Sequence, residues 1–338
     1  MLIRLFFDSF AMADEAEPHP QAKAVLDAVE SSPMPPTYAL SVESARAVLE
    51  EFFGNENPRP LGDVSEFAIE GPGGAIPLRV YQPPTPDPHP AVVFFHGGGW
   101  VIGSLDTHDN ICRWLCDEAD CTVVSVDYRL APEHPFPAAV EDCYAATAWV
   151  DAYGEKLGID TDRIAVAGDS AGGNLSAAVT LLARDERGVA AHRRTAPTVP
   201  DVAYQALLYP AVASPVLQEF DSQTENAEGY FLEWESVRWF YERYLPEPTH
   251  RRNEYAAPLL ADDLSGLPPA SVVTAGFDPL RDEGLAYADR LAAAGADVER
   301  HHYEGMIHGF SSLPEMMDAA GDSLDAVAAD LRAAFDSG

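Results

Sequence analysis

Apolar residues follow two different periods along this chain, and the periods alternate from about residue 62 to the end. Short apolar runs typical of buried strands are separated by stretches with apolar residues three and four positions apart, which is typical of helices. The predicted strands cover 64–70, 76–81, 91–95, 122–127, 163–168, 204–210, 270–276 and 297–303, and the predicted helices begin near 107, 137, 171, 236, 281 and 324. This alternation predicts an α/β fold with a mostly parallel central sheet flanked by helices.

The N-terminal part has a different pattern, with helical spacing over 22–29 and 42–52 and prolines between the two stretches. Two short amphipathic helices must bury their apolar faces on a later part of the chain, which indicates either a cap or a plain packing element. We therefore expect a poorly ordered extension over 1–20, a helical cap over 21–60 and one larger domain over 61–338. The long connection near 212–245 is expected to contribute to the cap. Translation could start at Met1 or at Met12.

Acidic residues greatly outnumber basic ones, 55 to 21, for a formal net charge of −34. This surplus argues against nucleic acid and anionic membranes as partners, because both need Lys and Arg to bind. No apolar run reaches the roughly 20 residues of a membrane span, and no export signal is recognisable, so we expect a soluble cytoplasmic protein. Only Lys23 and Lys156 are lysines, and the acids are spread over the whole chain. This pattern favours a halophilic organism over an ordinary acidic protein.

The four cysteines are expected to be buried, reduced thiols, because a chain of this length can build its core without disulfides. Cys112 and Cys116 lie one helical turn apart, but no second Cys or His pair with the spacing of a zinc site accompanies them. We therefore predict no metal site. The other two cysteines are Cys121 and Cys143.

The strongest chemical signal is the segment Gly168, Asp169, Ser170, Ala171 and Gly172, which fits the pattern G-x-S-x-G. It lies between a predicted strand and a predicted helix, which is the context that a nucleophilic serine requires. The two glycines let strand and helix pass closely. The Ala171 amide, at the helix N-terminus, points toward negative charge that forms beside the serine. A simple strand-to-helix turn is the alternative.

A second glycine-rich segment follows the apolar strand at 91–95: His96, Gly97, Gly98, Gly99 and Trp100. Unhindered glycine amides can approach an oxyanion closely, so we assign Gly98 and Gly99 to an oxyanion hole together with the serine-side amide. Neither glycine cluster has the spacing of a phosphate-binding loop, which argues against a nucleotide site.

The partners of Ser170 should follow it in the order acid, then histidine, at the carboxyl ends of strands. His308 lies in the loop after the last predicted strand, between two glycines, and Asp278 directly follows the strand at 270–276. Asp282, one turn into the next helix, is the second candidate for the acid. The other histidines after Ser170 break the order or fall inside a strand; they are His192, His250, His301 and His302.

These motifs together resemble the bacterial and archaeal esterases of the hormone-sensitive lipase family. The matching segments, in order, are HGGGW, DYRLAPEHPFPAA, GDSAGGN, DPLRD and IHGF, and they cover roughly residues 60 to 335. The resemblance implies an α/β-hydrolase fold with the N-terminal helices as a cap. It implies structural support from Arg129 and Glu133, and a substrate pocket near Trp100, Glu228, Gly229 and Tyr230. The segment 189–201 departs from the family pattern.

The function expected from these residues and from the resemblance is a serine hydrolase that cleaves short-chain acyl esters through a triad of Ser170, His308 and Asp278, without a cofactor. A small-molecule ester is the expected partner. Two alternatives remain: a non-catalytic receptor for a small apolar ligand, and an enzyme that uses the same triad on an amide, a lactone or an acetylated compound. The oligomeric state stays open, with a homodimer as one alternative.

The charge pattern predicts that folding and activity depend on salt. At about 1 M salt the Debye length is about 3 Å, whereas at about 0.01 M it is about 30 Å and carboxylates repel across much of the surface. We expect the melting temperature and the esterase rate to rise from dilute buffer to molar KCl, as followed by circular dichroism and nitrophenyl ester hydrolysis. Values that are flat, or highest in dilute buffer, would show that the acidity has another origin.

Overall fold

The computed structural model describes residues 17–32, 35–54, 58–187 and 198–337 of the chain. In this part of the chain the strands form one eight-stranded sheet in the order β1-β2-β4-β3-β5-β6-β7-β8. The pairs β1–β2 and β2–β4 are antiparallel and the others are parallel. The strands are β1 (Asp63–Gly71), β2 (Gly74–Gln82), β3 (His89–Phe95), β4 (Thr122–Val126), β5 (Ile159–Asp169), β6 (Val202–Leu208), β7 (Ala270–Phe277) and β8 (Val298–Ile307).

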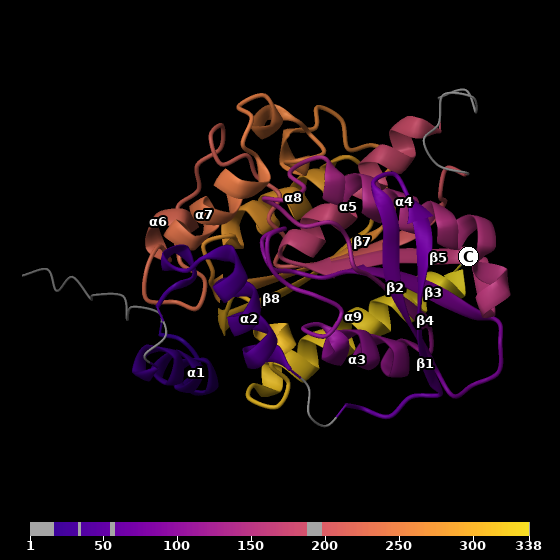
Figure 1. The fold of residues 1–338 in the computed structure, drawn as a ribbon, viewed down its shortest axis with the longest axis horizontal. Helices are drawn as coiled ribbons and strands as arrows, with labels where there is room; N and C mark the ends of the chain where they lie inside the picture. Colours follow the sequence, from indigo (N-terminus) through magenta and orange to yellow (C-terminus); the bar gives the residue numbers. More distant parts are fainter. Residues whose placement is uncertain (1–16, 33–34, 55–57, 188–197, 338) are drawn as a thin grey trace, which may run out of the picture.

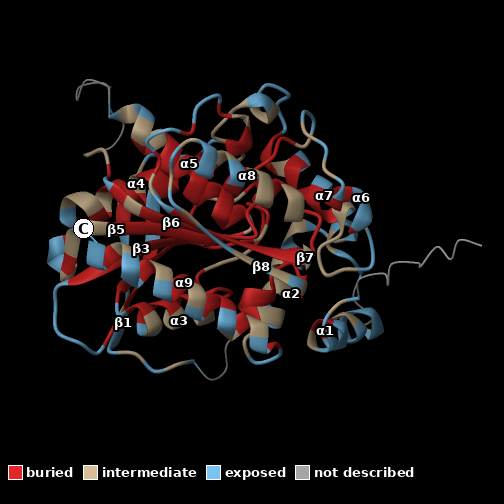
Figure 2. Cartoon of the chain, turned by 180° about the vertical axis from the view of Figure 1, so that it is seen from behind, coloured by how far each residue is buried: buried red, intermediate tan, exposed pale blue. Residues whose placement is uncertain are grey.

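The central strands are apolar on both sides because helices cover both faces of the sheet. In β3 all seven residues are buried. Val93 and Phe95 pack on one face of the sheet, and Val92 and Phe94 pack on the other. Figure 2 shows this buried interior as continuous red strands between the helical layers. The predicted mostly parallel sheet flanked by helices is therefore confirmed.

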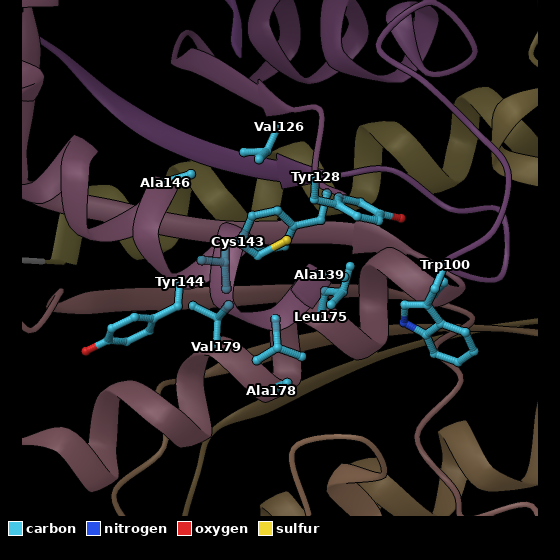
Figure 3. Close-up of a cluster of buried hydrophobic side chains, with 14 of the residues drawn as sticks. Trp100, Val126, Tyr128, Ala139, Cys143, Tyr144, Ala146, Leu175, Ala178 and Val179 are labelled. Atoms are coloured by element: carbon cyan, nitrogen blue, oxygen red, sulfur yellow. The ribbon is translucent and has the colours of Figure 1, made fainter. Parts of the chain in front are cut away.

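Two sets of helices form the outer layers (Figure 1). One face carries α4 (Ala138–Tyr153), α5 (Ala171–Glu186) and α8 (Arg281–Ala293), and the other carries α3 (Asp109–Ala119) and α9 (Asp318–Ser337). Figure 3 shows part of the first layer, where Cys143 of α4 and Val179 of α5 lie in the same buried cluster as Val126 of β4. Helix α9 begins six residues before the predicted start near 324, because Ala320 already belongs to its buried stripe.

The N-terminal helices lie where the apolar spacing predicts them. They are α1 (Pro20–Ser31) and α2 (Val42–Phe53), and Ser41 caps α2 by accepting a hydrogen bond from the Ser44 amide. In Figure 1 both lie at the same end of the molecule as α6 (Ser222–Glu225) and α7 (Trp234–Tyr244), which come from the long connection after β6. Most of the predicted extension, residues 1–16, and most of the segment 189–201 lie outside the described residues.

All four cysteines are buried free thiols, as the sequence predicts. Burial raises the pKa of the Cys116 thiol to about 12, so it stays protonated and unreactive. Within the described residues, no helix combines the length and apolar composition that crossing a bilayer requires.

A partly buried hydrogen-bond network connects the edge strand β8 to α9. Asp330 Oδ2 lies 2.7 Å from His301 Nε2 and accepts a hydrogen bond of 2.6 Å from Ser271 Oγ on β7. The hydrogen bond with Asp330 raises the pKa of the His301 imidazole above its ordinary value. The pKa of His301 is higher in the folded state than in the unfolded state. The stabilisation by this pair is therefore complete at pH values below the ordinary histidine pKa. Its contribution is lost as the pH rises through the raised value.

We expect His301→Gln to lower the free energy of unfolding by about 1 kcal/mol or less at about pH 6 and by less at about pH 9, because the pair is partly exposed to solvent. Urea unfolding of both proteins at the two pH values, in the same salt, measures this difference. A difference between wild type and variant that grows with pH would contradict the assignment.

Candidate active site

Ser170 lies at the turn between β5 and α5, in a backbone conformation with φ of 55°. This positive φ is strained for serine and is held by the surrounding backbone. The Ser170 amide donates to the Leu208 carbonyl at 2.8 Å, and the Ala211 amide donates to the Ser170 carbonyl at 3.2 Å. The turn also needs glycine beside it, because a Cβ at Gly172 would lie 1.8 Å from the carbonyl oxygen of Phe95.

His308 and Asp278 meet Ser170 at the carboxyl edge of the sheet. His308 follows β8 directly, and its Nε2 lies 3.0 Å from Ser170 Oγ. Asp278 follows β7 directly, and its Oδ2 lies 2.7 Å from His308 Nδ1. Asp278 is fully buried, and its Oδ1 accepts from the Leu280 amide at 2.8 Å. A carboxylate at Nδ1 keeps the proton on that nitrogen, so Nε2 is free to accept the serine proton.

The alternative partners lie elsewhere. Asp282 pairs with Arg281 at 2.7 Å and accepts from the Ser222 amide at 2.8 Å, in the first turn of α8. His301 is bonded to Asp330, as described above, and His302 Nδ1 lies 2.8 Å from Thr274 Oγ1 within β7–β8. His250 packs against the Phe136 ring, and His192 lies outside the described residues. Of the two candidate acids, the structure brings Asp278 to His308.

The loop after β3 presents backbone amides beside the serine. Gly98 and Gly99 have φ of 111° and 58°, in the region that favours glycine, and Trp100 has 61°. The Gly98 carbonyl accepts from the amides of Val101 and Ile102 at 3.1 and 3.0 Å. In the part of the chain that the structure describes, the amides of Gly98, Gly99 and Ala171 donate to no acceptor. These three residues line the same cavity as Ser170.

Asp169 ties this loop to the serine turn. Its Oδ1 accepts from the Gly97 amide at 2.9 Å, and its Oδ2 lies 3.2 Å from His108 Nε2. Burial alone would raise the pKa of the Asp169 carboxyl, but the charge of His108 and the hydrogen bond with it hold this pKa below its ordinary value. Asp169 is therefore an anion that holds the loop. The sequence alone gave no reason to single out His108, because its partner is 61 residues away.

His96 supports the same loop from below. Its Nδ1 lies 2.8 Å from the Gly97 carbonyl, and its ring stacks on Tyr128 at 4.3 Å between centroids. Burial lowers the pKa of His96 to about 3, so the imidazole is neutral. The Tyr128 hydroxyl donates to the His96 carbonyl at 2.7 Å. Figure 3 shows Tyr128 and Trp100 as members of one buried cluster, with Trp100 at its edge.

The candidate residues open into a cavity of about 830 Å³. Its walls are mainly apolar and come from α1, α2, the segment 229–233 and α7. Trp100, Gly229 and Tyr230 line it, but Glu228 is exposed and is not part of the described lining. The structure therefore does not bring Glu228 to the predicted pocket. Glu228 is exposed to solvent, whereas the residues that follow it, Gly229 to Glu233, line the cavity.

The described residues contain no group of three or more His, Cys, Asp or Glu side chains arranged to hold a metal ion. The arrangement can instead perform acyl transfer. It combines a hydroxyl hydrogen-bonded to an imidazole and an imidazole hydrogen-bonded to a buried carboxylate. The residues with unpaired amides line the same apolar cavity as the hydroxyl and the imidazole.

Comparison with known proteins identifies the family and the fold. Residues 92–312 match a family model described as the alpha/beta hydrolase fold. The chain is 45% identical to Esterase LipI of Mycobacterium tuberculosis, over 76% of this chain and 78% of that protein. It is 41% identical to Carboxylesterase NlhH of the same species, over 90% and 92%.

Solved structures of the same kind superpose closely. An ester hydrolase from the metagenome of Lake Arreo, Spain, superposes with a TM-score of 0.87 at 39% identity, over 94% of this chain and 99% of that one. The esterase of the hyperthermophilic archaeon Pyrobaculum calidifontis superposes with a TM-score of 0.84 at 39% identity, over the same shares. The chain thus belongs to the α/β-hydrolase fold family, on the hormone-sensitive-lipase-like branch that its motifs resemble.

Proposed function

We propose that this protein is a carboxylesterase that hydrolyses short-chain acyl esters through an acyl-enzyme intermediate on Ser170. The observation that carries the proposal is the unbroken hydrogen-bond chain from Ser170 Oγ through His308 to Asp278, with distances of 3.0 and 2.7 Å, at the base of an apolar cavity. The relatives reported above are named as esterases and carboxylesterases, which supports the same reaction.

In the first step Ser170 Oγ attacks the ester carbonyl carbon while His308 Nε2 takes the hydroxyl proton. The carbonyl electrons move onto oxygen, and the amides of Gly98, Gly99 and Ala171 donate to this oxyanion, with the N-terminus of the 16-residue helix α5 behind them. The bond to the alcohol then breaks. His308 gives its proton to the departing oxygen, which leaves an acyl group on Ser170.

In the second step water replaces the alcohol. His308 takes a proton from the water, the hydroxide attacks the acyl carbon, and the bond to Ser170 Oγ breaks as His308 returns the proton to it. One water is consumed and one carboxylic acid is released. Asp278 orients the imidazole throughout and stabilises its positive charge between the two transfers. Buried surroundings make each of these contacts stronger than it would be in water.

The acyl preference follows from the cavity wall. The rings of Phe52 and Phe53 on α2 lie 4.9 Å apart, and Phe231 lies 5.7 Å from Phe52. All three rings line the cavity and join α2 to the segment 229–233. We propose that this aromatic wall limits the acyl chain to a few carbons. A non-catalytic receptor is the less favoured function, since all three triad side chains are present and hydrogen-bonded to one another in series.

We also propose that the protein works at high salt in the cytoplasm of a halophile. The support for this is the surplus of acidic over basic residues, 55 to 21, together with a content of two lysines. Among the described residues arginine forms most of the ion pairs, as in Arg79 with Glu66 at 2.6 Å and Arg113 with Asp109 at 2.6 Å. Such fixed pairs hold carboxylates locally where flexible lysines are scarce.

The triad assignment predicts graded losses. We expect Ser170→Ala to lower kcat by on the order of 10⁶, His308→Ala by nearly as much, and Asp278→Asn by about 10⁴. Steady-state hydrolysis of nitrophenyl butyrate measures these losses. Asp282→Asn is the matched control, and we expect it to retain near-native kcat. Near-native hydrolysis by purified Ser170→Ala would contradict the assignment of the nucleophile. A loss of kcat in Asp282→Asn but not in Asp278→Asn would show that Asp282 is the acid.

The aromatic wall predicts the acyl preference. We expect kcat/KM on nitrophenyl esters from acetate to palmitate to peak at a few carbons. Phe52→Ala should shift this peak toward longer chains, because removing the ring opens the wall. Tyr153→Ala removes an exposed aromatic ring on α4, outside the cavity lining, and should leave the peak in place. A wild-type maximum at palmitate would contradict the proposed wall.

A further inference from the structure

Arg46 connects the N-terminal cap to the loop that carries the free glycine amides. It lies on α2, and its Nε donates to the Val101 carbonyl at 2.9 Å. Its Nη2 donates to the Ala131 carbonyl at 3.1 Å. The same guanidinium holds Glu133 at both oxygens, with distances of 2.9 and 2.7 Å. One planar side chain thus bridges three points of the body, each 55 or more residues away along the chain.

The ion pair between Arg46 and Glu133 contributes little to the connection between the cap and the loop. The two side chains are 30% and 54% exposed, and surface ion pairs contribute little, least of all in high salt. The carbonyl contacts differ, because Val101 and Ala131 are both fully buried. A buried carbonyl without a hydrogen-bond donor lowers the stability of the fold. Arg46, on the cap, donates to both of these carbonyls.

The peptide group between Val101 and Ile102 carries the contact further. A peptide group is planar and trans, so its carbonyl and its amide point in opposite directions. Arg46 holds the Val101 carbonyl of this group, and the Ile102 amide of the same group donates to the Gly98 carbonyl at 3.0 Å. The direction in which the Ile102 amide points is therefore set from the cap side.

The same geometry applies once more, at the peptide group between Gly98 and Gly99. Its carbonyl is held by the amides of Val101 and Ile102, at 3.1 and 3.0 Å. Its amide is that of Gly99 and must point the opposite way. Gly99 lines the cavity together with Ser170. The cationic side chain and two peptide groups form one hydrogen-bonded series, and such a series polarises each successive donor.

The loop is also fixed on its other side. The Ala131 amide donates to the Trp100 carbonyl at 2.9 Å, and the Trp100 ring stacks on Tyr244 at 4.4 Å between centroids. A side chain at position 99 would collide with the Phe240 ring. The far side is thus held by rigid packing against α7. The side toward α2 is held by the Arg46 guanidinium.

We propose that Arg46 is a positioning residue for ester hydrolysis, which couples the seated cap to the oxyanion hole by fixing and polarising the Gly99 amide. The inference rests on the proposed function. It implies that the cap does more than cover the acyl group, because the oxyanion hole is fully aligned only when α2 is docked. The effect belongs to the transition state, since the amide bonds the oxygen most strongly when it carries negative charge.

The test compares Arg46→Met and Arg46→Lys with Arg59→Met as the matched control. Arg59 is equally exposed, at 31%, and pairs with Asp117 and Glu118, which are outside the cavity lining. Kinetics on nitrophenyl butyrate are measured at molar KCl, with active sites counted by a phosphonate titrant. Affinity is measured for a trifluoromethyl ketone, whose adduct with Ser170 places an oxyanion in the hole.

We expect Arg46→Met to lower kcat about tenfold and to change KM by less than about twofold. This loss is smaller than the roughly 10²- to 10³-fold loss of kcat that follows removal of an oxyanion-hole donor itself. Ketone affinity should fall by about the same factor as kcat/KM. Arg46→Lys should recover part of the rate, because an ammonium can reach one carbonyl but cannot bridge both. Arg59→Met should match the wild type in all three measurements.

The inference is overturned if Arg46→Met matches Arg59→Met in kcat and in ketone affinity. It is also overturned if the whole loss is a loss of titratable sites, with normal kcat and ketone affinity at the sites that remain. Because activity is expressed per titrated site, partial unfolding of Arg46→Met does not imitate the expected result, and Arg46→Lys provides the milder change. A wild-type protein that hydrolyses no ester would instead remove the proposed function, and this inference with it.

Discussion

The close crossing of three backbone segments at Ser170 is the constraint on which the rest of the site depends. Helix α5 passes so near the end of β3 that only hydrogen fits on Gly172 beside the Phe95 carbonyl. This crossing forces the positive φ of Ser170 and pushes its side chain out of the sheet edge. The strain is tolerated because the Ser170 amide and carbonyl are both held by the segment around Leu208 and Ala211. Because Ser170 is held rigidly, the hydrogen bonds around its hydroxyl meet an oxygen atom in a fixed position.

The buried carboxyl groups around this point are matched by hydrogen bonds. Asp278 is satisfied by His308 and the Leu280 amide, and Asp169 by the Gly97 amide and His108. A third acid, Glu283, accepts from the amides of Val212 and Ala213 at 2.7 and 3.1 Å, just after the segment that holds the serine. Burial raises the pKa of Glu283 to about 8. Each carboxyl fixes a loop that approaches the cavity, so the polar groups of the site are held in place before any substrate binds.

Helix α2 contacts the rest of the molecule through the hydrogen bonds of Arg46 and through the aromatic wall that it forms with Phe231. Only Ala45 of α2 is fully packed, whereas Phe52 and Phe53 face the cavity and Arg46 reaches the glycine loop. In our proposal, the same short helix both covers the substrate and aligns the amides. This explains physically why residues that precede the whole sheet in sequence bear on chemistry at its carboxyl edge.

The sequence by itself determined the strand and helix order, the nucleophile turn and the candidates for its partners, because these depend on local periodicity and on short motifs. Position in the sequence left Asp278 and Asp282 both open as the acid. The family resemblance placed Glu228 near the pocket, but its side chain is exposed and is not part of the described lining. Tertiary structure decided which acid reaches His308, that His108 faces Asp169, and that Arg46 bonds Val101. These contacts span 30, 61 and 55 residues. No local pattern encodes such distances, since they exist only once the sheet has brought its strand ends together and the cap has docked on them.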